Sequence, residues 1–161
     1  MGLSIQVTLK QDEPMTVAYY SARGGMDQVP SAFNKLYSWI REKGYKAKGP
    51  AILVYYDLPG QVQEKDLRWE LRSQISDELD AIEPNSEGFG VKHLRPGQVA
   101  ATLYRGPYDK IEQTYISLRD WISENSYEIN GPYEELYLNT SAEPEELITE
   151  LRFPVQKKGS D

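Results

Sequence analysis

Apolar residues follow two different spacings along the chain, and these spacings predict its secondary structure. In two stretches they recur every three or four positions, as along one face of a helix. The first stripe consists of Val29, Phe33, Leu36 and Ile40, and the second of Ile111, Tyr115, Leu118 and Ile122. We therefore expect one helix in each stretch. Pro30 suits the first turn of the first helix, and Gly44 suits its C-terminal end.

The other apolar residues form short runs rich in β-branched and aromatic side chains, which is typical of strands. These runs cover residues 3–9, 15–22, 51–57, 66–75, 89–94, 98–104, 133–139 and 146–155. Gly49-Pro50 and Gly131-Pro132 are expected to break the chain after each helix, because both residue types favour turns. Residues 77–87 are polar and acidic, so we expect a linker there, with a helical turn at its start.

The second half of the chain repeats the first at an offset of 82 residues. Between residues 14 and 55, 14 of 42 positions are identical to the position 82 residues later. The first-half members of these pairs are Pro14, Val17, Ala18, Arg23, Gly24, Asp27, Leu36, Trp39, Ile40, Glu42, Tyr45, Gly49, Pro50 and Tyr55. Further on, Glu70-Leu71-Arg72 matches Glu150-Leu151-Arg152. Such a repeat fixes the architecture more firmly than any single element does.

Each repeat has the order strand, helix, strand, strand, preceded by a short lead-in strand. Two such βαββ units predict an α+β fold with pseudo-twofold symmetry, in which two helices pack on an antiparallel sheet. We expect a single domain over residues 1–161. Its first repeat covers about 1–76, the linker 77–87, and the second repeat about 88–156.

The composition excludes several classes of function. Lys and Arg number 18 against 25 Asp and Glu, a net charge of −7, so direct binding to nucleic acid is not expected. Cysteine is absent, which excludes thiol chemistry and fits a reducing, cytoplasmic compartment. The single histidine, His93, is expected at the surface, and we expect neither a metal nor a cofactor. No apolar run is long enough to cross a membrane.

Tyrosine is over-represented, with 12 residues against 3 Phe and 3 Trp. Its ring is apolar and its hydroxyl polar, which suits a surface that must be both. The repeat helps to choose among these residues, because a position that differs between the halves is freer to serve a ligand. Trp39 and Trp121 are identical partners, so we expect both to serve packing.

Glu135 is the main candidate for a binding residue, because Leu53 stands at the equivalent position of the first repeat. Strand alternation places Glu135 on one face with Tyr133 and Tyr137. A carboxylate between two tyrosines would suit a cationic ligand. In the alternative, Glu135 is solvated, and Leu136 and Leu138 mark the buried face.

Further candidates lie at other positions where the repeats differ. Tyr108 stands opposite Met26, Tyr104 opposite Ala22, Tyr20 opposite Thr102, and Trp69 opposite Thr149. Tyr55, Glu70 and Glu150 are conserved between the halves. The two glutamates could either bond to a neighbouring strand or border a pocket, and Tyr55 is a further candidate wall.

Several short sequence motifs of the second half, taken in this order, resemble those of the GyrI-like superfamily. They are Arg105-Gly106-Pro107-Tyr108, Thr114-Tyr115 with Leu118 and Trp121-Ile122, Gly131-Pro132-Tyr133-Glu134-Glu135-Leu136-Tyr137-Leu138, and Thr149-Glu150-Leu151-Arg152-Phe153-Pro154-Val155. In the first half, Gly49-Pro50 and Glu70-Leu71-Arg72 agree as well. That superfamily includes gyrase-inhibitory proteins and the effector-binding domains of AraC-type and MerR-type regulators. The resemblance spans essentially the whole chain and implies the same duplicated βαββ fold.

The resemblance implies a pocket between the halves that takes amphipathic, often cationic, aromatic molecules. It assigns the ligand-facing glutamate to Glu135, and it places Tyr108 at the start of the second helix beside the pocket. The two repeats use up the length of the chain, so no helix-turn-helix module is expected. If the chain regulates transcription, it needs a protein partner.

Three functions are compatible with these residues. The first is a small-molecule-binding protein acting in sensing, sequestration or xenobiotic resistance, with Glu135 as anchor and aromatic walls around it. The second is a hydrolase of reactive cyclopropane-type electrophiles, in which Glu135 is the general base and a tyrosine such as Tyr108 donates to the oxyanion. The third is a protein–protein inhibitor with DNA gyrase as its partner.

Overall fold

The chain divides into two compact units, which we describe separately. The structure, a computed structural model, describes residues 5–76, 78–95 and 97–159. The central unit is Pro14–Arg95, and the terminal unit combines Met1–Glu13 with Pro96–Asp161. Pro96, which the repeat pairs with Pro14, and residues 3–4 of the first expected strand lie outside the described residues.

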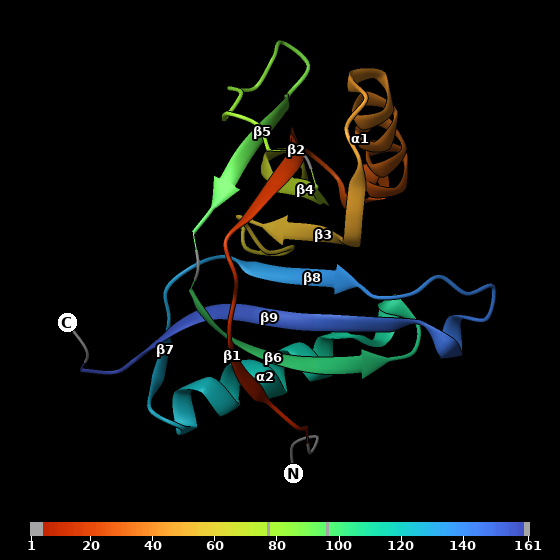
Figure 1. The fold of residues 1–161 in the computed structure, drawn as a ribbon. Coiled ribbons are helices and arrows are strands. Elements are labelled where there is room, and N and C mark those ends of the chain that lie inside the picture. Colours follow the sequence, from red (N-terminus) through yellow and green to blue (C-terminus); the bar gives the residue numbers. More distant parts are fainter. Residues whose placement is uncertain (1–4, 77, 96, 160–161) are drawn as a thin grey trace. The chain divides into compact units, whose positions relative to one another are not determined.

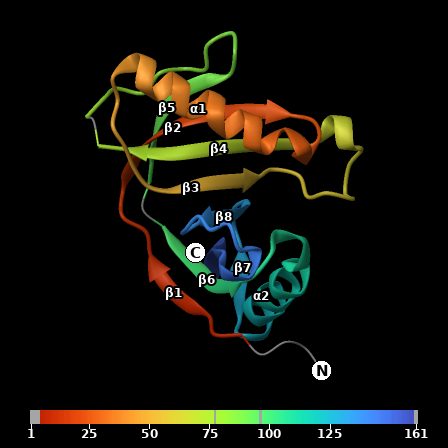
Figure 2. The same ribbon diagram turned by 90° about the vertical axis from the view of Figure 1, so that its right-hand side faces the viewer.

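The central unit is a four-stranded antiparallel sheet with one helix on its face. Its strands are β2 (Met15–Arg23), β3 (Ala47–Tyr55), β4 (Arg68–Ile75) and β5 (Phe89–Leu94), in the spatial order β5-β2-β4-β3. The helix α1 (Val29–Lys43) lies across the sheet (Figures 1 and 2). Two single helical turns, η1 (Met26–Gln28) and η2 (Glu64–Asp66), precede α1 and β4.

The terminal unit has the same plan. Its strands are β1 (Thr8–Gln11), β6 (Gln98–Arg105), β8 (Tyr133–Tyr137) and β9 (Ile148–Lys157), in the order β1-β6-β9-β8. A short strand, β7 (Tyr127–Ile129), also pairs with β9. Here α2 (Glu112–Glu124) covers the sheet, and the single turns are η3 (Tyr108–Lys110) and η4 (Pro144–Glu146). The α+β class with two helices on antiparallel strands is confirmed, while the duplication stays a prediction.

The lead-in strands do not pair as the repeat boundaries suggest. From its position in the chain, each lead-in strand was expected to belong to the repeat at whose start it lies. Instead β1 pairs with β6 of the second repeat, and β5 pairs with β2 of the first. Each unit therefore contains the lead-in strand of the other repeat.

Local chemistry accounts for the helices. Pro30 lies in the first turn of α1, and Gly44 follows its last residue in the left-handed conformation, with φ 75°. The apolar stripe faces the sheet, because Leu36 and Ile40 are buried in α1 and Leu118 and Ile122 are buried in α2. The N-terminal members of both stripes are half-buried.

Several expected boundaries and turns differ from the structure. Gly49-Pro50 does not break the chain: β3 already begins at Ala47 and passes through the pair with a bulge between Lys48 and Ala51. Gly49 accommodates this bulge with φ 76°. The expected strand 133–139 ends at Tyr137, and no helical turn begins the linker within its described residues.

At Gly131-Pro132 the expected break does occur, between β7 and β8. His93 is exposed, as expected. Neither helix in the described part of the chain is both long and apolar enough to span a membrane.

Candidate functional site

Glu135 lies on β8, inside the terminal unit. Its residue is 6% exposed, so the alternative of a solvated Glu135 is wrong. Both carboxylate oxygens accept hydrogen bonds from tyrosine side chains. The Tyr133 hydroxyl donates to Oε2 at 2.8 Å, and the Tyr137 hydroxyl donates to Oε1 at 2.8 Å. Strand alternation, which puts the three side chains on one face, thus brings the phenols to the carboxylate.

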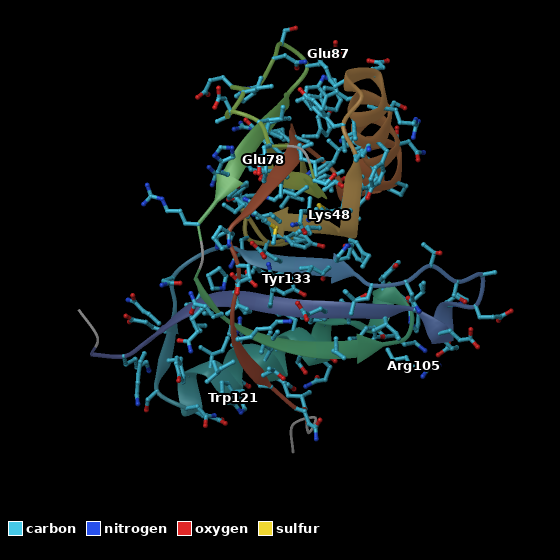
Figure 3. All side chains as sticks on the ribbon, viewed as in Figure 1. Lys48, Glu78, Glu87, Arg105, Trp121 and Tyr133 are labelled. Carbon is cyan, nitrogen blue, oxygen red and sulfur yellow. The ribbon has the colours of Figure 1, made fainter. Side chains whose placement is uncertain are left out.

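This face of the sheet is the one that α2 covers. The ring of Tyr115, on α2, lies 4.8 Å from the ring of Tyr133 and 5.6 Å from that of Phe153 on β9. Glu135 pairs with Leu151 across the β8–β9 ladder. Tyr133 and Trp121, on β8 and α2, are labelled in Figure 3. The carboxylate therefore lies among aromatic and aliphatic side chains.

Tyr108 forms the outer part of this group. It begins η3 and is 48% exposed, and its ring meets the ring of Tyr137 edge-on at 5.4 Å. Partial burial and then the negative charge of Glu135 raise the pKa of the Tyr108 hydroxyl above its usual value. That hydroxyl stays protonated at neutral pH and remains a hydrogen-bond donor. We call Tyr108, Tyr133, Glu135 and Tyr137 the Glu135 cluster.

The neighbouring carboxylates have cationic partners. Glu134, on the opposite face of β8, accepts a hydrogen bond from Arg152 at 2.9 Å. Glu150 accepts one from Lys10 at 2.6 Å. Burial alone would lower the pKa of Arg152, but the charges of Glu134 and Asp12 outweigh it and raise that pKa. Glu150, which we expected to border a pocket or to bond a neighbouring strand, does both: it is bonded by Lys10 of β1, and it lines a groove of about 730 Å³ together with Tyr104.

The central unit contains the same ion arrangement. Glu70 on β4 is bonded by Arg72 and by Lys92, the latter at 2.8 Å. Lys92 and Lys10 are 82 residues apart and lie on the two lead-in strands, so they keep the offset of the predicted repeat upstream of Pro14, where the listed identities begin. Glu70, like Glu150, thus bonds a lead-in strand.

Trp69 and Tyr104 occupy related positions in the two units. Trp69 on β4 is 1% exposed, and its indole N–H donates to the Gly24 carbonyl at 3.0 Å. Tyr104 on β6 donates its hydroxyl to the Pro107 carbonyl at 2.7 Å. In the central unit Ala22 of β2 pairs with Trp69 of β4, and in the terminal unit Tyr104 of β6 pairs with Thr149 of β9. The aromatic residue of the pair is therefore on the later strand in the central unit and on the earlier strand in the terminal unit. Both rings therefore brace the turn that leads to the helix.

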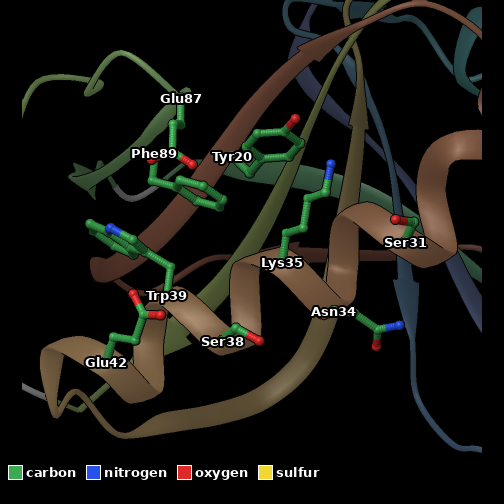
Figure 4. Close-up of a pocket in the computed structure, with 9 residues that line it drawn as sticks. All are labelled: Tyr20, Ser31, Asn34, Lys35, Ser38, Trp39, Glu42, Glu87 and Phe89. Atoms are coloured by element: carbon green, nitrogen blue, oxygen red, sulfur yellow. The ribbon is translucent and has the colours of Figure 1, made fainter.

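Tyr20 and Tyr55 belong to the central unit, whereas the Glu135 cluster belongs to the terminal unit. Tyr55 pairs with Trp69 across β3 and β4. Tyr20 lines a groove of about 630 Å³ beside α1 (Figure 4). There its ring stacks on Phe89 at 4.8 Å, and Phe89 stacks on Trp39 at 5.6 Å. Because these rings stack on one another, their stacked faces are not available to a ligand. The charged side chains of this groove are exposed, so water weakens their attraction to a ligand, and the groove is a poorer candidate site than the Glu135 cluster.

Eight residues were expected around one site, and within the terminal unit the structure brings three of them together: Glu135, Tyr137 and Tyr108. Sequence reasoning did not name Tyr133 as a binding residue, although alternation placed it beside Glu135. It also missed Thr149, which was noted only as the counterpart of Trp69. Within the described residues there is no group of three or more Asp, Glu or His side chains that could hold a metal ion.

A comparison with known protein families finds a match over most of the chain. Residues 5–156 match the GyrI-like small molecule binding domain. The chain belongs to this family. No curated protein sequence matched the chain.

Solved structures of similar fold include two of the protein EcmrR. The EcmrR C-terminal domain is 19% identical, with a TM-score of 0.82, over 96% of this chain and 99% of that one. EcmrR in complex with DNA has a TM-score of 0.81 at 19% identity, over 94% of this chain. This chain covers only 57% of that longer EcmrR chain.

Two further structures share the fold at lower similarity. A hydrolase from Listeria innocua is 13% identical, with a TM-score of 0.68, over 94% of this chain and 92% of that one. SAV2435 bound to tetraphenylphosphonium is 15% identical, with a TM-score of 0.59, over 94% of both chains. At these identities the similarity establishes the fold and leaves the ligand open.

Proposed function

We propose that this GyrI-like domain binds an amphipathic cation with aromatic character at the Glu135 cluster, and that it acts in sensing, sequestration or xenobiotic resistance. One observation carries the proposal. Glu135 is a buried carboxylate that accepts hydrogen bonds from the phenols of Tyr133 and Tyr137, on a sheet face that carries further aromatic rings.

Neutral donors have a particular consequence for a carboxylate. The hydroxyls of Tyr133 and Tyr137 fix the orientation of Glu135, but they add no positive charge to it. In a poorly solvated site, that charge attracts a cation more strongly than it would in water. The faces of nearby aromatic rings attract cations as well, by about 0.5–2 kcal/mol each.

The structural neighbours make the same class of ligand a reasonable first choice. SAV2435 was solved with tetraphenylphosphonium, a lipophilic aromatic cation. Its 15% identity to this chain does not transfer the ligand, so the compound is used here as a probe.

The test is a calorimetric titration of the protein with tetraphenylphosphonium, for the wild type and for Glu135→Gln. The amide keeps the shape of the side chain and removes its charge. We expect micromolar binding by the wild type and a loss of about 10- to 100-fold in Glu135→Gln, the range of a charge-assisted contact. Glu143→Gln is the matched control, because Glu143 is exposed on a loop of the same unit. Equal affinities in wild type and Glu135→Gln would contradict the proposal.

The second candidate function is hydrolysis of a strained, cyclopropane-type electrophile at the same cluster. It is favoured by the Tyr108 hydroxyl, whose raised pKa keeps it protonated beside a carboxylate. Glu135 would take a proton from water as the water oxygen attacks the ring carbon. In a cyclopropane conjugated to a carbonyl, the electron pair of the broken C–C bond would pass to the carbonyl oxygen as an enolate, to which Tyr108 would donate a hydrogen bond, and protonation of the enolate carbon would complete the addition of water.

Mass spectrometry of an incubated cyclopropane substrate separates the two functions. Hydrolysis requires a product heavier by one water, formed by the wild type and lost in both Glu135→Gln and Tyr108→Phe. Binding without any such product leaves the domain a sensor or a sequestering protein.

A further inference from the structure

The side chain of Thr149, on β9, is the one buried hydroxyl of the terminal unit that lacks a hydrogen-bond partner among the described residues. Thr149 is 0% exposed. A hydroxyl enclosed without a partner has lost its hydrogen bonds to water, which destabilises the folded state. Such a group in a folded protein needs an explanation.

Strand register places Thr149 beside the Glu135 cluster. It pairs with Tyr137 of β8 on one side and with Tyr104 of β6 on the other. Directly paired residues of antiparallel strands point to the same face, with Cβ atoms about 5 Å apart. Glu135, two residues before Tyr137, lies on that face too. The hydroxyl is thus the nearest polar neighbour of the cluster on β9.

The fold does not require a hydroxyl at this position. In the central unit the equivalent residue is Trp69, whose side chain is large and mostly apolar. The ring that braces the turn in the terminal unit is supplied by Tyr104, which bonds the Pro107 carbonyl without using Thr149. A valine would fill the volume of Thr149 and avoid the cost of an unpartnered hydroxyl. Packing alone therefore leaves the threonine unexplained.

We propose that Thr149 Oγ1 accepts a hydrogen bond from an N–H group of the ligand, while Glu135 binds its positive charge. The inference rests on the proposed binding function and narrows its ligand class. The site would prefer protonated amines, amidinium or guanidinium groups over quaternary ammonium and phosphonium ions, which have no N–H to donate.

The exposure of the rings indicates how a ligand reaches this atom. Thr149 Oγ1 is enclosed in the present arrangement, whereas Tyr137 is half-buried and Tyr108 is half-exposed. These two rings meet edge-on at the outer end of the cluster. A ligand that reaches Thr149 from this end would have to displace these two rings.

The test compares two probes that differ only in their N–H groups, naphthylmethylammonium and its N,N,N-trimethyl derivative. Tetraphenylphosphonium serves as a third probe without an N–H. We expect Thr149→Val to weaken naphthylmethylammonium binding about 10-fold and to change the other two affinities by less than about 2-fold. Thr149→Ser, which restores the hydroxyl, should restore the preference.

A second hydroxyl provides the matched control. Thr102 is also buried, but its hydroxyl donates to the Gln6 carbonyl at 2.7 Å. Thr102→Val should lower the urea midpoint without altering the preference among the probes. Thr149→Val should leave the urea midpoint unchanged or raise it. If it does not fold, Thr149→Ala is titrated with the same three probes.

The outcomes separate this inference from the proposed function. Suppose that the probes bind the wild type and that Glu135→Gln weakens their binding. If Thr149→Val then changes the affinities for naphthylmethylammonium and its N,N,N-trimethyl derivative equally, the inference is overturned and the proposed function stands. If no probe binds the wild type, both are overturned. Selective loss of naphthylmethylammonium binding in Thr149→Val supports the inference.

Discussion

Glu134 and Glu135 are adjacent in sequence, but their carboxylates accept hydrogen bonds from different kinds of donor. Alternation sends Glu134 to Arg152 on one face of β8 and Glu135 to two phenols on the other. In Glu134 a full positive charge offsets the cost of burial. At Glu135 two phenols donate to the carboxylate oxygens, and the proposed binding of a cation rests on this environment.

The hydroxyl of Tyr137 should contribute measurably to stability. Tyr137→Phe keeps the ring and removes one donor to Glu135, which leaves a buried carboxylate oxygen with one fewer hydrogen bond. We expect the free energy of unfolding in urea to fall by about 1–3 kcal/mol.

Tyr127→Phe is the control for this change. Tyr127 stacks on Trp121, and its hydroxyl has no hydrogen bond to any residue that the structure describes. Its loss should change the free energy of unfolding by less than about 0.5 kcal/mol. Equal effects of both substitutions would mean that the Tyr137–Glu135 bond adds nothing to folding.

Part of this site was predictable from sequence. Alternation along β8 and the change from Leu53 to Glu135 pointed to this carboxylate as a candidate and predicted that it shares a face with Tyr133 and Tyr137, as it does. The placement of Trp69 and Tyr104 was not predictable, because each ring braces a turn through a backbone carbonyl, and no sequence pattern reports such a contact. The orphaned hydroxyl of Thr149 likewise depends on how neighbouring strands pack.

At the scale of elements, the two helices end in the same backbone conformation with different residues. Gly44 follows α1 with φ 75°, and Ser126, 82 positions later, has φ 66° soon after α2. A side chain in the left-handed region costs about 1 kcal/mol or more, whereas glycine adopts it freely. The second helix end is therefore the strained one.

Exchanging these residues should move stability in opposite directions. Ser126→Gly should raise the free energy of unfolding by about 1 kcal/mol, because it relieves the left-handed conformation. Gly44→Ser should lower it by a similar amount, although an added Cβ at Gly44 meets no atom within 4 Å. Thermal unfolding followed by circular dichroism measures both. A loss of stability in Ser126→Gly would show that the serine side chain has a stabilising contact.

The sequence predicted the type of most elements and failed on their partners. Periodicity is a local property, so it located α1, α2 and the strands. Pairing of β1 with β6 joins residues far apart in sequence, and a short apolar run carries no information about which edge it will occupy. At Gly49-Pro50 the turn propensity was real, but pairing of β3 with β4 absorbed it as a bulge.

For the whole molecule, the excess of tyrosine implies a stability limit at alkaline pH. Burial is the first cause that raises the pKa of Tyr19, Tyr37, Tyr56, Tyr104 and Tyr108 above the model-compound value of 10.0. The folded chain therefore holds these protons more tightly than the unfolded chain does. Their contribution to stability is complete below pH 10 and is lost as the pH rises through the folded-state values.

Urea midpoints should accordingly be flat from pH 8 to about pH 10 and fall above it. Tyrosinate absorbance at each pH would show whether ionisation accompanies unfolding. Tyr108→Phe should make the decline shallower, since one of the shifted groups is gone. If the urea midpoint instead increased as the pH was raised above 10, this account would be contradicted.

The exchanged lead-in strands have a consequence for a chain that is cut between its repeats. A protease that cleaves the exposed segment around Pro84 and Asn85 severs one peptide bond and produces two fragments. The first fragment still contributes β1 to the sheet around β6, and the second still contributes β5 to the sheet around β2. Neither fragment can complete a sheet from its own residues. The two halves are thus built to reassemble with each other, as a split protein does.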